Sequence, residues 1–150
     1  MRYLMFLLLL AGSLAWMGCA PAGLEGTIAA SGTVTHNGQP VEGATVVFSP
    51  EGEGRAASGL TDASGRFQLQ TLNPDDGVLP GKYQVAISKT QVEGGMSEEE
   101  SQAYTAEHGK SPEVTVKDLL PEKYKSPATS GLAAEVTASD KNEFTFDLKD

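Results

Sequence analysis

Cysteine and histidine are scarce in this sequence of 150 residues, and this scarcity limits the chemistry open to the protein. Cys19 is the only cysteine, so no disulfide bond can form within the chain. His36 and His108 are the only histidines, and neither has a second metal ligand or a catalytic partner at a recognisable spacing. We therefore expect no catalytic residue, no metal site and no cofactor.

Positive charge is also in short supply. Eleven lysine and arginine side chains stand against twenty aspartates and glutamates, which gives a formal net charge of -9. A polyanion would meet a repulsive field, and no long basic patch offsets it. Nucleic acid is therefore not an expected partner. The 17 glycines and 8 prolines favour a folded domain rich in turns over a helical bundle.

The first residues have the composition of an export signal. Arg2 supplies a positive charge, and an apolar run follows at residues 4–10. The whole apolar stretch over residues 3–17 is shorter than the ~20 residues of a spanning helix, and no basic flank follows it. We predict a signal peptide at residues 1–18, and a transmembrane anchor is the alternative.

Cys19 follows Gly18 at the end of this stretch, and the arrangement resembles the lipobox of bacterial lipoproteins. In that motif the cysteine thiol is acylated and becomes the mature N-terminus, so the resemblance implies an exported protein held on a membrane by a lipid on Cys19. Alanine instead of aspartate at position 20 implies sorting to the outer membrane; a periplasm-facing membrane remains open. Cleavage within Ala20-Pro21-Ala22 would instead release a secreted chain that begins near Gly23.

The rest of the chain is expected to form one domain. We predict a flexible linker at residues 19–30 and the domain at residues 31–150. Short β-rich runs alternate there with turn signals. Asn37-Gly38 predicts a tight hairpin, with Pro40 in the connection after it, and residues 62–65 predict the turn of a second hairpin.

Alternation of apolar and polar residues predicts which side chains face the core. The predicted inward positions are Phe67, Leu69, Tyr83, Val85, Ile87, Phe144, Phe146 and Leu148.

A polar, glycine-containing stretch interrupts this pattern at about residues 90–113. We predict an exposed insertion there, with a helix over residues 97–107 that begins behind a Ser97 cap. Residues 114–124 are expected to return to the sheet. The expected fold is an all-β antiparallel sandwich of about seven strands, of the immunoglobulin-like kind.

Four motifs, taken together and in order, resemble the carboxypeptidase regulatory-like domain, a transthyretin-like module. They are Gly32-Thr-Val-Thr35, Asn37-Gly-Gln-Pro-Val-Glu-Gly-Ala44, Thr61-Asp-Ala-Ser-Gly-Arg-Phe67 and Pro80-Gly-Lys-Tyr-Gln-Val85. The segments Leu120-Pro-Glu-Lys-Tyr124 and Thr129-Ser-Gly-Leu132 are similar to small lipoproteins of planctomycete bacteria that carry this domain. The resemblance implies a prealbumin-like β-sandwich, an extracytoplasmic setting, and a binding or structural role.

The remaining candidates for chemistry each have a simpler interpretation. Asn73, Asp75 and Asp76 are hard oxygen ligands that calcium favours, but Asn-Pro-Asp-Asp-Gly is also ordinary turn chemistry. A transthyretin-like hydrolase would require a Tyr-Arg-Gly-Ser C-terminal signature, whereas this chain ends Phe-Asp-Leu-Lys-Asp150. The run Glu98 to Glu100 is more typical of a solvated face than of a binding site.

We therefore expect a non-enzymatic, lipid-anchored module of the cell envelope with a binding or structural role. Its expected partners are the membrane, through the lipid, and an envelope protein or a polysaccharide. The alternative is a secreted module that binds carbohydrate or calcium.

Overall fold

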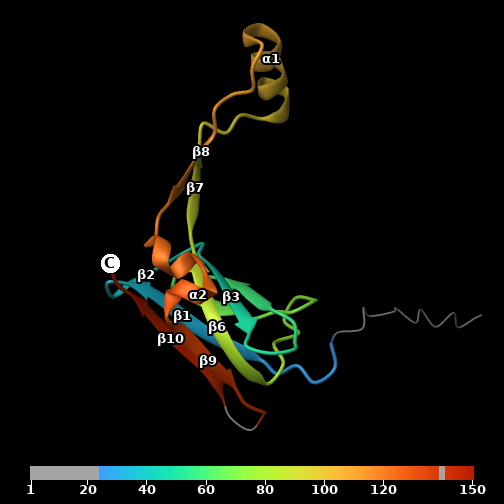
Figure 1. Ribbon diagram of the computed structural model, residues 1–150, viewed down its shortest axis with the longest axis vertical. Coiled ribbons are helices and arrows are strands. Elements are labelled where there is room, and N and C mark those ends of the chain that lie inside the picture. Colours follow the sequence, from blue (N-terminus) through green and yellow to red (C-terminus); the bar gives the residue numbers. More distant parts are fainter. Residues whose placement is uncertain (1–23, 139–140) are drawn as a thin grey trace, which may run out of the picture.

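Two sheets pack face to face, and each is built from strands whose alternate side chains point into the space between them. The computed structural model describes residues 24–138 and 141–150. Figure 1 shows the two layers and a long arm that projects from them. The first sheet has the order β10-β1-β2, with β5 also paired to β1, and the second has the order β4-β3-β6-β9. The strands of the first sheet are β1 (Ala30–His36), β2 (Gln39–Pro40), β5 (Arg66–Gln68) and β10 (Asn142–Leu148). Those of the second are β3 (Thr45–Pro50), β4 (Ala57–Leu60), β6 (Gly81–Ser88) and β9 (Leu132–Val136).

The all-β sandwich is confirmed, with two differences from the expected strand arrangement. Eight strands of the described chain form the two sheets, and they include the two-residue β2, in which Pro40 is the register partner of Thr35 at the sheet edge. Strand β10 runs parallel to β1, whereas an antiparallel sheet was expected. The connection before β10 passes from β9 in one sheet to β10 in the other, so β10 pairs with β1 instead of forming a hairpin with β9.

The turn of the predicted second hairpin is present and the two segments that flank it share one antiparallel bridge, Ser58 with Gln70, but their main partners lie in different sheets. Strand β4 pairs with β3 and β5 pairs with β1, so the turn at residues 62–65 carries the chain from one sheet to the other. Asp62 Oδ1 accepts hydrogen bonds from the backbone N–H groups of Ser64 at 2.8 Å and Arg66 at 3.0 Å. Gly65 has φ +75°, and a Cβ there would meet the carbonyl oxygen of Val34. Only glycine therefore fits where this turn passes β1.

The predicted inward faces form one core between the sheets. Phe67, Leu69, Val85 and Ile87 are at most 2% exposed, and Phe144 is half-buried against the same cluster. Phe48 lies at the centre of this core and is completely buried. Aromatic contacts to Phe48 come from both sheets, so the two layers share one packed interior.

The arm comprises residues 90–118 and stands away from the sandwich (Figure 1). Two short strands, β7 (Thr90–Glu93) and β8 (Thr115–Asp118), pair antiparallel and lead to a helix, α1 (Glu98–His108), at the tip. The predicted helix is confirmed: Ser97 is its N-cap and forms a capping box with Glu100. In the described part of the chain, no helix is long and apolar enough to cross a membrane.

The chain rejoins the sandwich later than expected. Residues 114–124 were expected to form a sheet strand, but β8 belongs to the arm, and a 3-10 helix, η1 (Glu122–Lys125), and a short helix, α2 (Pro127–Ser130), follow it. Pro121 precedes η1 and disfavours a continued central strand, because proline cannot donate a ladder hydrogen bond. Leu120 and Tyr124 are buried and fasten this segment to the core.

Candidate functional site

The expected lipidation residue, Cys19, lies outside the described residues, as does the predicted signal peptide. The other candidates from the sequence are placed by the structure, and it separates them. His36 lies at the end of β1, while His108 lies in the last turn of α1. Across residues 24–138 and 141–150, no three side chains of histidine, cysteine, aspartate or glutamate gather closely enough to hold a metal ion.

His36 belongs to a cluster that ties the β1–β2 turn to the end of the chain. Its Nε2 lies 2.9 Å from Oδ1 of Asp150, and Asn37 Nδ2 donates to Oδ2 of the same carboxylate at 2.9 Å. The hydrogen bond from Asn37, and then that with His36, lower the pKa of Asp150. The cluster is exposed and joins two chain segments, which is a structural task.

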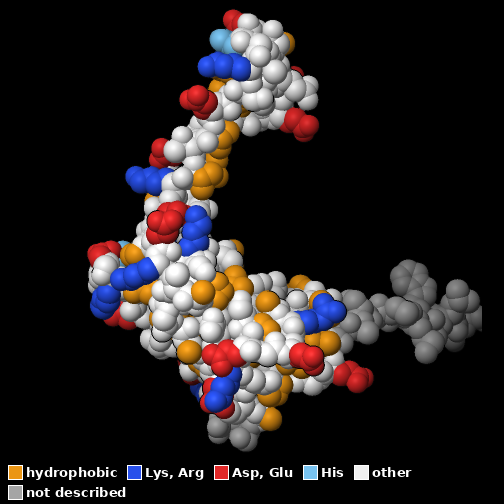
Figure 2. Space-filling model, in the orientation of Figure 1, with side chains coloured by type: hydrophobic (Ala, Val, Ile, Leu, Met, Phe, Trp, Pro, Cys, Tyr) orange, Lys and Arg blue, Asp and Glu red, His pale blue; other side chains and the backbone are white. Residues whose placement is uncertain are grey.

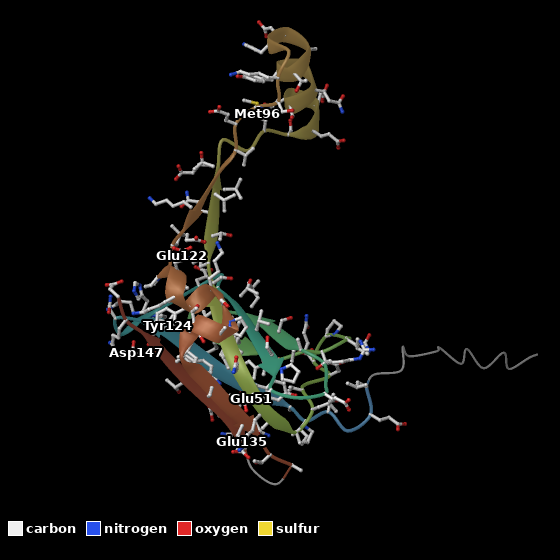
Figure 3. All side chains as sticks on the ribbon, viewed as in Figure 1. Glu51, Met96, Glu122, Tyr124, Glu135 and Asp147 are labelled. Atoms are coloured by element: carbon white, nitrogen blue, oxygen red, sulfur yellow. The ribbon has the colours of Figure 1, made fainter. Side chains whose placement is uncertain are left out.

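Asp147 makes a second set of bonds at the same end of the sandwich (Figure 3). Its carboxylate contacts Lys149 Nζ at 2.6 Å and accepts from Thr35 Oγ1 at 2.8 Å and from the backbone N–H of Gly38 at 3.1 Å. The contact with Lys149, followed by those with Thr35 and Gly38, lowers the pKa of Asp147 to about 2. These bonds hold β10 against β1 and its turn.

The possible calcium ligands form a turn. Both oxygens of Asp76 are engaged by backbone N–H groups, from Thr71 at 2.6 Å and from Leu72 and Asn73 at 2.9 Å each. These three bonds lower the pKa of Asp76 and occupy most of the roughly four acceptor positions that a cation would need. The geometry therefore favours the turn interpretation over the calcium interpretation.

A polar groove lies where β4 and β5 pass each other on the side of the sandwich. It encloses about 440 Å³ and is open to solvent. Arg66, Gln68 and Gln70 are exposed at alternate positions and line it together with Leu60 and Asp62. The backbones of β4 and β5 approach closely here, since a Cβ on Gly59 would meet the carbonyl oxygen of Gln68. Such a row of amide and guanidinium groups can donate and accept hydrogen bonds.

A smaller hollow of about 210 Å³ lies on the outer surface of β6 and β9. Glu51 and Glu135 border it together with Lys82, and Figure 3 shows these two glutamates on the lower part of the sandwich. Its mixed charges and shallow shape give it no feature of a built site.

Exposed hydrophobic side chains gather on the arm, which holds four of the seven large ones in the described chain. Val92 on β7 lies directly across from Val116 on β8, and Val114 lies two residues before Val116 on the same face. These three side chains, which we call the valine face, are 58%, 59% and 52% exposed, respectively. Figure 2 shows hydrophobic side chains in a row along one side of the arm and charged ones on its other side.

The opposite face of this ribbon is polar. Gln91 and Lys117 form one cross-strand pair, and Glu93 and Thr115 form the next. Met96, 46% exposed, lies where the ribbon meets α1 (Figure 3). None of the residues of α1 is buried, so the helix adds nothing to the core.

The base of the arm is fixed to the sandwich. Lys125 Nζ forms an ion pair with Asp118 at 3.0 Å, and the backbone N–H of Leu119 donates to the carbonyl of Lys89 at 2.8 Å. Leu120 is buried one residue further on. The arm therefore leaves the sandwich in a defined direction.

These features define an all-β sandwich of eight strands with a projecting, one-sided apolar arm. A family model of the carboxypeptidase regulatory-like domain matches residues 29–117, from the residue before β1 into β8. The match covers more than half of the chain, and the protein therefore belongs to this family, whose domains are non-catalytic modules. No curated protein and no solved structure matches the chain.

Sequence reasoning missed the paired ribbon of the arm, although a signal was present. Residues 90–93 and 114–117 are two short alternating segments placed symmetrically around a capped helix. Two such segments at the ends of one polar insertion can pair with each other, and neither then needs a partner strand in the sandwich. Read together, they predict the ribbon.

Proposed function

We propose that this protein is a non-enzymatic binding module of the cell envelope, anchored by a lipid on Cys19. In this proposal the sandwich is a scaffold and the arm carries the binding surface. The family membership supports the non-catalytic role, and the likeness of the Gly18-Cys19 region to a lipobox supports the anchor.

The observation that carries the binding role is the exposed valine face on an arm that supplies nothing to the core. No residue between Thr90 and Asp118 is buried. An isolated two-stranded ribbon is at best marginally stable in water, so a partner that covers its apolar face would stabilise it. Covering the three valines and Met96, each about half exposed, would contribute roughly 3–6 kcal/mol.

Intact mass spectrometry of protein extracted from its own membranes tests the anchor. We expect a chain that begins at Cys19 and carries two or three acyl groups. The matched control is Cys19→Ser, which removes the only thiol and should leave the protein without a lipid. An unmodified wild-type chain that begins near Gly23 would contradict the anchor and identify a secreted module.

A second candidate function, carbohydrate binding, is favoured by the polar groove. The row of Arg66, Gln68 and Gln70 offers side-chain hydrogen bonds along an open channel. A glycan that binds only the folded state must raise the melting temperature. At a free glycan concentration of a hundred times its dissociation constant, the free energy of unfolding rises by about 2.7 kcal/mol. The measurement is a melting screen with neutral cell-envelope oligosaccharides.

The control for that screen is a glutamine away from the groove. Gln68→Ala should abolish the shift, while Gln84→Ala, an exposed change on β6 of the other sheet, should keep it. An equal shift in both variants would remove the groove from consideration.

A further inference from the structure

Beginning from the binding role proposed above, we infer that the valine face docks on another protein, at an apolar strip bordered by lysine or arginine side chains. Val92, Val114 and Val116 form this surface on one face of the ribbon, and the arm around it is strongly acidic.

The ribbon has the geometry of one layer of a two-layer β structure. Val92 and Val116 are cross-strand partners, and Val114 extends the same face toward the tip. All three are more than half exposed, and β7 and β8 make their main contacts with each other. An apolar strip on a partner would complete the layer, because alternate side chains of paired strands present one continuous face.

The charge around this face selects the chemistry of the partner. Residues 90–118 hold seven acidic and two basic side chains, so the arm carries more than half of the formal net charge of -9. Glu93 lies on the opposite face of the ribbon, one residue from Val92, and Glu98 to Glu100 follow in the first turn of the helix. An apolar face on an arm of this charge is complementary to an apolar strip bordered by basic side chains.

The negative charge of the arm disfavours two other occupants, a second copy of this chain and a membrane surface. A second copy would bring an equally acidic arm, so the two arms would repel each other. A membrane surface is anionic and attracts basic segments, whereas this arm is acidic. A basic protein surface is the remaining occupant that both observations favour.

Photo-crosslinking in the cells that carry the gene tests the proposal on the full chain. Photoreactive benzoylphenylalanine replaces Val116 on the valine face, or Lys117 on the opposite face as the matched control. We expect an adduct to one other protein from position 116, about tenfold stronger than that from position 117. The linked peptide should carry lysine or arginine beside apolar residues.

The charge requirement is tested in the same cells. Glu93→Lys combined with Glu113→Lys should lower the yield at position 116 about tenfold, since the formal charge of the arm then falls from -5 (seven acidic, two basic) to -1 (five acidic, four basic) and most of its attraction for a basic partner is lost. Both glutamates are exposed, so the melting temperature should stay unchanged and report an intact fold. An unchanged yield would overturn the basic partner.

Four further outcomes overturn the proposal. They are an adduct to a second copy of this chain, an adduct with the mass of a phospholipid, equal yields at positions 116 and 117, and no adduct at either position. The mass of the N-terminus is read from the same samples. A lipid-modified chain without an adduct refutes the docking alone, whereas an adduct on a chain without lipid refutes the anchor alone.

Discussion

Phe48→Ala is the substitution that tests the core most directly. The Phe48 ring is fully buried on β3, and its centroid lies 5.8 Å from that of Tyr83 in the same sheet. Three rings of the other sheet also contact it: Phe144 at 5.4 Å, Phe146 at 6.2 Å and Phe67 at 6.4 Å. The substitution therefore removes the contact that both layers share.

The expected loss is large compared with the stability of a small domain. Truncation of a buried phenylalanine to alanine costs about 3–5 kcal/mol, which includes the cavity that it leaves. The aromatic contacts of Phe48 favour the upper part of that range, because such pairs add about 0.5–1.5 kcal/mol beyond area burial. A domain of this kind is stable by only about 5–15 kcal/mol, so the variant should be close to unfolding.

Urea denaturation followed by circular dichroism measures this change. The control is Leu60→Ala, because Leu60 is 67% exposed and its truncation should change stability by less than about 0.5 kcal/mol. A loss below about 1 kcal/mol for Phe48→Ala would refute a single core shared by both sheets, because it would fall under the range for a buried aromatic side chain.

Three further substitutions test the contacts outside that core. Tyr124→Phe should destabilise the protein by about 1–3 kcal/mol in thermal melting, because the Tyr124 hydroxyl donates to the Lys149 carbonyl at 3.1 Å and accepts from the Lys149 N–H at 3.0 Å. Asp147→Asn should be destabilising near neutral pH. Because the folded-state pKa of Asp147 is lowered to about 2, its ionised form stabilises the fold fully above the unfolded pKa of about 4, and that stability is lost as the pH falls toward 2. The difference in melting temperature between wild type and variant should therefore shrink over that interval; a constant difference would contradict the assignment. Ser97→Ala should weaken α1 locally by about 1 kcal/mol, seen as faster amide exchange in the helix, while the global melting temperature stays unchanged because α1 buries no residue.

The sequence was most informative wherever one local property decides the structure. The inward positions Phe67 and Tyr83 were predictable because alternation reports directly which face of a strand is buried. The start of α1 was predictable because Ser97 and Glu100 form a capping box, a signal complete within four residues. The likeness to the carboxypeptidase regulatory-like domain added the order of strands and turns.

The sequence was least informative where the partner of a strand decides the outcome. The turn after β4 predicts that the chain reverses direction. Only the pairing of β5 with β1 decides which sheet β5 joins. The direction of β10 depends in the same way on its crossing between layers. The valine face was the feature least predictable from the sequence, because alternation at residues 114–118 fits a strand of the sandwich as well as a free ribbon.

The valines of the arm have a simpler explanation, which is that valine favours extended strands. That explanation predicts valine on either face of the ribbon. Instead, Val92, Val114 and Val116 share one face, while the opposite face has glutamine, glutamate, threonine and lysine. Threonine is also β-branched, and it already stands in both strands, at Thr90 and Thr115.

Val92→Thr separates the two explanations, because it keeps the β-branched shape and replaces an apolar methyl by a hydroxyl. If valine is present only for strand propensity, the crosslink from position 116 should survive this substitution. If the valine face is a docking surface, the yield should fall several-fold while the amide exchange of β7 and β8 stays as in wild type. Loss of the crosslink together with melting of the ribbon would show that Val92 is needed to form the arm, and would leave Val114→Thr, outside the paired register, as the variant that isolates docking.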